Sequence, residues 1–149
     1  GDRLDTDIAG ANAAGLPSLL VLCGVSTADD SVRAGVGLRP TYIARDLRSL
    51  SAGADTLRVG PHPAWHIDID SAVVTVRSTG SDPVDEVSVV RAVASAVWNA
   101  GLDGEPRRAH RIRMAAAAGV PDGRHMVDVH TEPQMVSHDR RSSIARPAS

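Results

Sequence analysis

The chain has 149 residues, of which 42% are hydrophobic, so it is long enough for one ordinary domain or two small ones. It contains no Phe and only 2% aromatic residues, so its core must be built from aliphatic side chains. The net charge of −2 argues against a nucleic-acid-binding protein, and no apolar run approaches the roughly 20 residues that cross a bilayer.

The first 50 residues alternate helix and strand signals. Thr6 and Asp7 offer N-cap side chains before an Ala-rich segment that ends at Gly15, which predicts a helix. The apolar run 18–23 is typical of a strand buried on both faces of a parallel sheet.

A polar loop at residues 27–31 is expected next, before a short segment at 32–34. Residues 40–44 then predict a second strand and residues 46–50 a closing helix. This alternation of helices and strands is the rhythm of a doubly wound parallel α/β sheet.

Small, turn-prone residues at 51–56 predict a linker, after which the pattern changes. Residues 65–69 and 73–77 predict a β-hairpin, and Asp82 with Pro83 predicts the start of an amphipathic helix that runs to about residue 100. In this α+β unit the two tryptophans are expected to be core anchors.

Beyond residue 107 neither helical nor strand periodicity persists, although Ile112 and Met114 would suit a strand. The predicted organisation is therefore a parallel α/β segment at 1–51, a small α+β unit at 57–106 and a poorly ordered tail at 107–149.

Three carboxylates, those of Asp2, Asp5 and Asp7, fall within six residues. If a strand ends at residues 1–2, they cross from the carboxyl end of a strand to the start of a helix, the edge at which open α/β sheets bind ligands. A carboxylate there suits Mg²⁺, which binds through one or two carboxylates and keeps several waters. On spacing alone, an Asp-rich cap in a solvated loop is an equally good interpretation.

The surrounding residues favour the metal site. Gly-Asp-x-x-x-Thr-Asp-Ile at 1–8, Ala-Gly-Leu-Pro at 14–17 and Val-Leu-Cys-Gly-Val-Ser at 21–26 together resemble the fourth motif of the haloacid dehalogenase superfamily, subclass IIA. Residues 40–50 are similar to the last strand and helix of that core. Residues 89–98 resemble the acetyltransferase-like C-terminal domain of glycerol-3-phosphate phosphatases from high-GC bacteria.

The resemblance implies that Asp2 is a Mg²⁺ ligand and that Asp7 is a supporting carboxylate in the second shell of the metal. It implies a phosphatase that works through an aspartyl-phosphate, with its nucleophile and cap domain upstream of this chain, so that the chain alone is inactive. The phosphate-binding Lys of the family must also lie elsewhere, because all 16 basic residues here are Arg. No catalytic residue is therefore expected in this chain.

The expected substrate is a small phosphorylated metabolite, most simply glycerol 3-phosphate, with phosphoglycolate or 4-nitrophenyl phosphate as alternatives. No nucleic-acid or membrane partner is expected, and the cytoplasm is the expected location. A different hypothesis makes residues 57–106 a regulatory or interaction module, because no Gly/Ala-rich loop for the pyrophosphate of acetyl-CoA is evident.

Several residues imitate functional motifs. Asp68 and Asp70 resemble a nucleophile pair, but they follow the metal motif and lack its Gly-Thr continuation, so a solvent-facing hairpin is favoured. His62 and His66 are four apart with a proline between them, which forbids a helical metal pair. Cys23 is interpreted as a small buried residue and not as a nucleophile.

Overall fold

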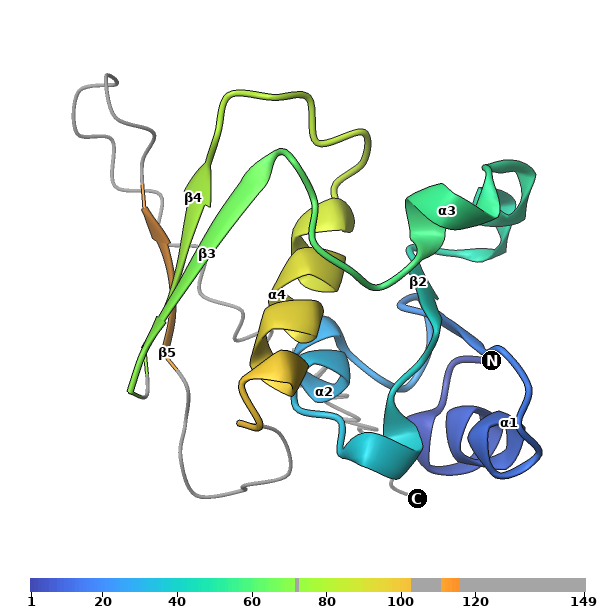
Figure 1. Cartoon of the computed structure of the whole chain (residues 1–149). Helices are drawn as coiled ribbons and strands as arrows, with labels where there is room; N and C mark the ends of the chain where they lie inside the picture. The colour runs from blue at the N-terminus through green and yellow to red at the C-terminus, as the bar shows by residue number, and fades with distance from the viewer. Residues whose placement is uncertain (72, 103–110, 116–149) are drawn as a thin grey trace, which may run out of the picture.

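The computed structural model describes residues 1–71 and 73–102, together with the backbone of residues 111–115. A long helix, α4 (Ser88–Asn99), lies between a three-stranded sheet and a smaller two-stranded sheet (Figure 1). The predicted fold class, a parallel α/β segment followed by a small α+β unit, is confirmed.

The two-stranded sheet pairs β1 (Leu19–Val21) with β2 (Tyr42–Ala44) in parallel. Gly1 pairs with the other side of β1, because its amino group donates to Leu19 O at 2.9 Å and its carbonyl accepts from Val21 N at 3.0 Å. This pattern is that of a parallel strand pair. Gly1 and Asp2 therefore stand at the carboxyl edge of the sheet.

Short helical elements connect these strands. They are η1 (Leu4–Ile8), α1 (Ala9–Ala13), α2 (Ala28–Val32), η2 (Val36–Leu38), η3 (Leu47–Ser51) and α3 (Ala54–Leu57). The first helix begins earlier than predicted, at Leu4, so Asp7 lies within the helical segment and is not its cap. Part of the predicted linker is helical, since α3 occupies its second half.

The predicted loop at 27–31 is wrong, because α2 begins at Ala28. Thr27 and Asp30 form a capping box: the Thr27 hydroxyl accepts from the Asp30 amide at 3.1 Å, and the Asp30 carboxylate accepts from the Thr27 amide at 2.8 Å. These reciprocal bonds satisfy two backbone donors that would otherwise face water.

Thr27→Ala removes one half of this box and is expected to destabilise the chain by about 1 kcal/mol. Urea unfolding followed by circular dichroism measures the loss. The exposed Thr6 makes no capping bond, so Thr6→Ala is the matched control and should leave the unfolding midpoint in place. Equal stability of the two variants would show that the box contributes nothing.

The three-stranded sheet has the order β3-β4-β5. β3 (Trp65–Asp70) and β4 (Val73–Ser78) form the predicted antiparallel hairpin, and β5 (Arg111–Ala115) runs parallel to β4. The sheet therefore continues beyond residue 106, into the segment expected to be a tail. The rest of that expected tail lies outside the described residues.

The start of α4 differs from the prediction. Asp82 accepts a hydrogen bond from the Val84 amide at 2.9 Å, and Val84 itself has φ +67°. A β-branched residue in the left-handed region cannot continue a right-handed helix. The chain therefore bends at residues 84–85 and turns at 86–87, and the helix begins six residues after Asp82, at Ser88.

One hydrophobic cluster spans both predicted units. Leu20 and Ile43 of the first unit and Val74, Val76 and Val97 of the second are at most 1% exposed, and all belong to this cluster. Helix α4 supplies the connection, because it contacts β2 and α2 on one side and β3 on the other. The two predicted units are therefore packed together.

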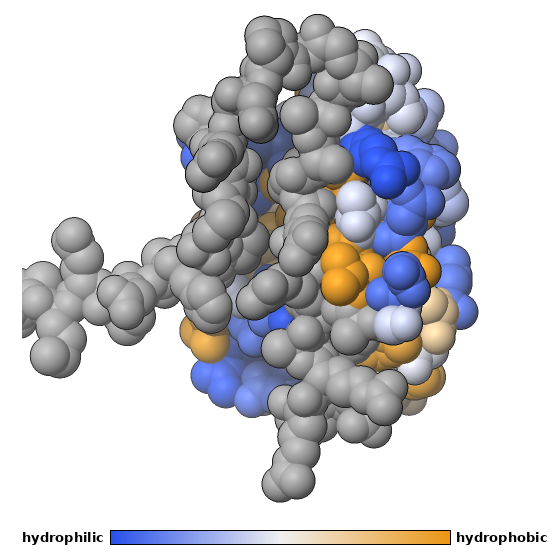
Figure 2. Space-filling view, turned by 90° about the vertical axis from the view of Figure 1, so that its left-hand side faces the viewer, coloured by the Kyte–Doolittle hydropathy of each residue, from blue (hydrophilic) through white to orange (hydrophobic). Residues whose placement is uncertain are grey.

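On the side of the three-stranded sheet, the described residues in view are mostly hydrophilic, with a smaller group of hydrophobic ones (Figure 2). In the part of the chain that the structure describes, no helix has both the length and the apolar character needed to cross a membrane.

Candidate metal site

Asp2 follows the short strand position of Gly1 and faces the loop after β1. Its carboxylate Oδ2 accepts a hydrogen bond from the Val25 amide at 3.1 Å, and its main-chain oxygen accepts from the Ser26 amide at 2.9 Å. Among the described residues none donates to Oδ1 of Asp2. One carboxylate oxygen is thus held in place, and within the described part of the chain the other has no donor and can take a ligand.

Asp7 supports the same turn from the helix side. Its Oδ2 accepts from the amides of Asp2 at 3.0 Å and of Arg3 at 3.2 Å. These bonds place a negative charge at the amino end of the first helical turn, where the helix dipole favours it. Asp7 therefore fixes the backbone that carries Asp2. It does so from within the helical segment and not from the N-cap position that the sequence indicated.

Two glycines make room for the two carboxylates. A Cβ atom at Gly1 would overlap the side chain of Asp7, and a Cβ atom at Gly24 would overlap that of Asp2. Any other residue at either position would displace a carboxylate. The site is a cradle of fixed carboxylate oxygens, the donor type that Mg²⁺ prefers, so the residues present fit this ion.

The cradle is one part of a metal site. Among the described residues there is no group of three or more His, Cys, Asp or Glu side chains that could hold a metal ion. Asp2 would accordingly be one ligand, with the remaining ligands contributed by waters or by residues outside those described.

Asp5 does not share this arrangement. It is exposed and paired with Arg3, whose Nε lies 3.1 Å from Oδ1 and whose Nη2 lies 2.8 Å from Oδ2. The hydrogen bond from Arg3 lowers the pKa of Asp5 below its ordinary value. The three carboxylates thus divide into two that build the cradle and one that forms a surface ion pair.

The hairpin carboxylates and histidines lie elsewhere. Asp68, with 44% of its side chain exposed, accepts from Arg77 Nη1 at 2.5 Å and lies 3.1 Å from His66 Nε2. Asp70 is exposed, and the His62 ring accepts from the Ala64 amide at 3.2 Å. The solvent-facing interpretation of this hairpin agrees with these positions.

Cys23 corrects one expectation. It is exposed and not buried, because β1 ends at Val21 and Cys23 lies in the turn that follows. The strand signal of the apolar run extended two residues too far.

Both tryptophans anchor the core, as expected. The Trp65 indole donates to Ser88 Oγ at 2.9 Å, which joins the hairpin to α4. The Trp98 indole donates to Val32 O at 3.1 Å, and the Arg39 guanidinium lies 5.5 Å from its ring centroid. Trp98 therefore also connects α4 to the first unit.

A buried arginine completes the junction between the units. Arg91, whose side chain is 2% exposed, donates from Nη1 to Ile43 O at 2.9 Å and from Nη2 to both carboxylate oxygens of Asp85 at 2.8 and 2.7 Å. The Ile43 carbonyl belongs to the outer edge of β2. Nothing in the helical pattern of α4 indicated this role, because a charged residue is expected on the solvent side.

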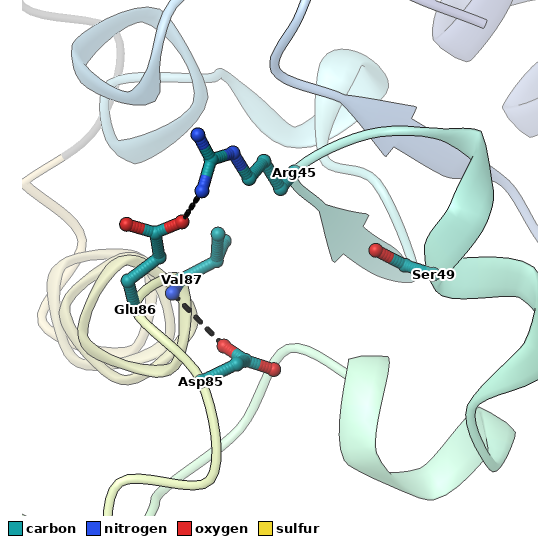
Figure 3. Close-up of a pocket in the computed structure, with 5 residues that line it drawn as sticks. All are labelled: Arg45, Ser49, Asp85, Glu86 and Val87. Atoms are coloured by element: carbon teal, nitrogen blue, oxygen red, sulfur yellow. Dashed lines mark hydrogen bonds and ion pairs between the residues drawn. The ribbon is translucent and has the colours of Figure 1, made fainter.

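Asp85, the partner of Arg91, lines a pocket of about 310 Å³ together with Arg45, Ser49, Glu86 and Val87. Figure 3 shows Arg45, from the segment after β2, directed toward Glu86, while the Val87 amide is bonded to Asp85. The charged groups of this pocket therefore already have partners within the junction.

Two known families match this chain. Residues 1–50 match the HAD-hydrolase-like family, and residues 62–118 match the GCN5-related N-acetyltransferase-like domain. D-glycerol 3-phosphate phosphatase of Mycobacterium tuberculosis is 57% identical over 105 residues, which cover 67% of this chain and 30% of that protein.

Two crystal structures of glycerol phosphate phosphatase from Mycobacterium tuberculosis are also similar. The complex with calcium matches 77% of this chain and 34% of its own, with 53% identity and a TM-score of 0.70. The complex with magnesium matches 77% and 32%, with 52% identity and a TM-score of 0.66. The chain spans about a third of the length of these relatives. Its residues 1–50 are thus similar to the HAD-hydrolase-like family, and its residues 62–118 are similar to the N-acetyltransferase-like domain.

Proposed function

We propose that this chain is part of a Mg²⁺-dependent phosphatase that hydrolyses glycerol 3-phosphate in the cytoplasm. The observation that carries the proposal is the cradle of Asp2, Asp7 and Gly24 at the carboxyl edge of the parallel sheet, in a segment of the hydrolase family. The high identity to a D-glycerol 3-phosphate phosphatase supports the choice of substrate.

In this mechanism Asp2 would hold the Mg²⁺ ion through its carboxylate. Bound there, the ion would neutralise the negative charge of the phosphoryl group during transfer. Asp7 would keep the backbone of Asp2 in place, since its carboxylate binds the Asp2 and Arg3 amides. The phosphate-binding Lys of the family would come from outside these 149 residues, since the chain contains no Lys. By the family resemblance, the nucleophilic Asp would also come from outside them.

A chimera tests the proposal. In this chimeric protein, called the chimera below, the part of the chain that aligns with the Mycobacterium tuberculosis enzyme replaces the aligned segment of that enzyme. We expect Mg²⁺-dependent release of phosphate from glycerol 3-phosphate, with slower release from phosphoglycolate and 4-nitrophenyl phosphate. The chain by itself should release none. A folded chimera without activity on any of the three esters would contradict the proposal.

Asp7→Asn in the chimera is expected to lower activity or Mg²⁺ affinity by about 10–100-fold, the usual cost of losing support for a metal ligand. The amide keeps one acceptor oxygen but loses the charge that binds the Asp2 and Arg3 amides. Asp5→Asn removes a carboxylate two residues away and is the matched control. Steady-state kinetics across Mg²⁺ concentrations should leave Asp5→Asn near wild type, and equal losses in both variants would refute the division of roles.

The acetyltransferase-like segment has a second candidate role. We infer that it is a non-catalytic module that braces the hydrolase segment, because Arg91 and Trp98 of α4 bind backbone carbonyls of that segment. Isothermal titration of the chain with acetyl-CoA should show no binding. Saturable binding would favour a transferase instead.

A further inference from the structure

Residues 24–26, in the loop after β1, contact Asp2 closely, although none of them is expected to take part in catalysis. We propose that this loop is a clamp that positions Asp2, fixing one carboxylate oxygen and leaving the other free for the metal ion. The inference rests on the proposed function, in which Asp2 is a Mg²⁺ ligand. It adds positioning roles for Gly24 and Ser26.

The clamp holds the side chain of Asp2 from two directions. The Val25 amide donates to Oδ2 at 3.1 Å, a hydrogen bond to a charged acceptor. Gly24 lies so close to the same side chain that a Cβ atom would overlap both Oδ2 and the Cβ of Asp2. The close approach leaves no room for a Cβ atom at this position, so a residue other than glycine would displace the side chain of Asp2.

Ser26 holds the backbone on either side of Arg3. Its amide donates to Asp2 O at 2.9 Å, and its hydroxyl accepts from the Leu4 amide at 3.1 Å. Ser26 is 9% exposed and Leu4 is 7% exposed, so water cannot readily replace the hydroxyl. The serine thus ties the start of the first helix to the loop after β1.

Together with Asp7, these bonds leave little freedom at Asp2. Its amide is bound by Asp7 and its carbonyl by Ser26, while Oδ2 is bound by Val25. Oδ1 accepts no hydrogen bond from the described residues. A metal ligand held in this way does not lose side-chain freedom when the ion binds, which favours affinity.

The alternative is that Ser26 and Gly24 only close a loop. A purely structural role would change stability but not the metal affinity of the molecules that remain folded. The variant Ser26→Thr keeps the hydroxyl, so it should restore whatever Ser26→Ala removes. Two matched controls exist: Gly10 has nothing within 4 Å of an added Cβ, and Ser31 is a buried serine whose hydroxyl, among the described residues, bonds only Ala28 O.

The experiment is a Mn²⁺ titration of the isotopically labelled 149-residue chain, followed by paramagnetic broadening of amide NMR signals. In the wild-type chain we expect the strongest broadening at residues 1–8 and 22–26, and its loss in Asp2→Asn. Gly24→Ala and Ser26→Ala should weaken the apparent Mn²⁺ affinity by about 10–100-fold. Ser26→Thr, Gly10→Ala and Ser31→Ala should bind as the wild type does, and unshifted signals of the β3–β4 hairpin report that each variant is folded.

The outcomes separate the two claims. If Asp2→Asn abolishes broadening while folded Gly24→Ala and Ser26→Ala bind Mn²⁺ like the wild type, the clamp is refuted and the metal site stands. Equal weakening in the control variants would also refute the clamp. Absence of broadening near Asp2 in the wild-type chain, or its survival in Asp2→Asn, would refute the metal role of Asp2 and the clamp with it.

Discussion

Arg91→Met is expected to lower the free energy of unfolding by about 3 kcal/mol. Arg91 is buried, and its guanidinium joins the Ile43 carbonyl of β2 to the carboxylate of Asp85. Methionine fills similar space but donates no hydrogen bond, so the carbonyl and the carboxylate both lose their partner. Asp85 keeps 35% of its side chain exposed, which limits the penalty for its unpaired charge.

The same substitution at Arg33 is the control. Arg33 pairs with Asp29 one helical turn away at 2.7 Å, and its side chain is 37% exposed. An exposed i,i+4 pair contributes only about 0.3–0.5 kcal/mol, so Arg33→Met should be nearly neutral. Urea unfolding of both variants decides the matter. A loss below about 1 kcal/mol for Arg91→Met would show that the junction does not depend on this arginine.

Asp2→Asn has the largest expected effect on catalysis. In the chimera we expect kcat/KM for glycerol 3-phosphate to fall roughly 100-fold or more, the scale seen when one group that stabilises developing charge is removed. The asparagine retains the shape of Asp2, so the Val25 amide still has an oxygen to bind. What is lost is the negative charge that would hold Mg²⁺. A variant within about threefold of wild type would be incompatible with Asp2 as a ligand.

Local patterns in the sequence predicted the elements that depend on local chemistry. The alternation of apolar and polar residues predicted the β3–β4 hairpin, and the apolar run predicted β1, although the strand is shorter. The same local signals failed where a single residue changes the backbone, as Val84 does before α4. The sequence contains the residues of the capping box, Thr27 and Asp30. A loop was nevertheless predicted there, because the segment is short and polar.

The arrangement of the site depended on contacts distant in sequence. The spacing of Asp2 and Asp7 indicated two carboxylates at one turn, but the loop that holds Asp2 lies more than 20 residues further along. The burial of Arg91 against Ile43 joins residues 48 apart and has no periodic signature. Propensity and spacing identify the residues that can meet, whereas tertiary packing decides which of them do.

A Mg²⁺ titration of the chimera, comparing Asp2→Asn with Asp68→Asn, tests the central claim most directly. Both variants remove one carboxylate charge, but Asp2 lies in the cradle and Asp68 is paired with Arg77 on the hairpin. The account predicts that Asp2→Asn loses most of its turnover and requires far more Mg²⁺, while Asp68→Asn titrates like the wild type. Equal damage in Asp68→Asn, or an unchanged Mg²⁺ requirement in Asp2→Asn, would contradict the assignment of the metal site.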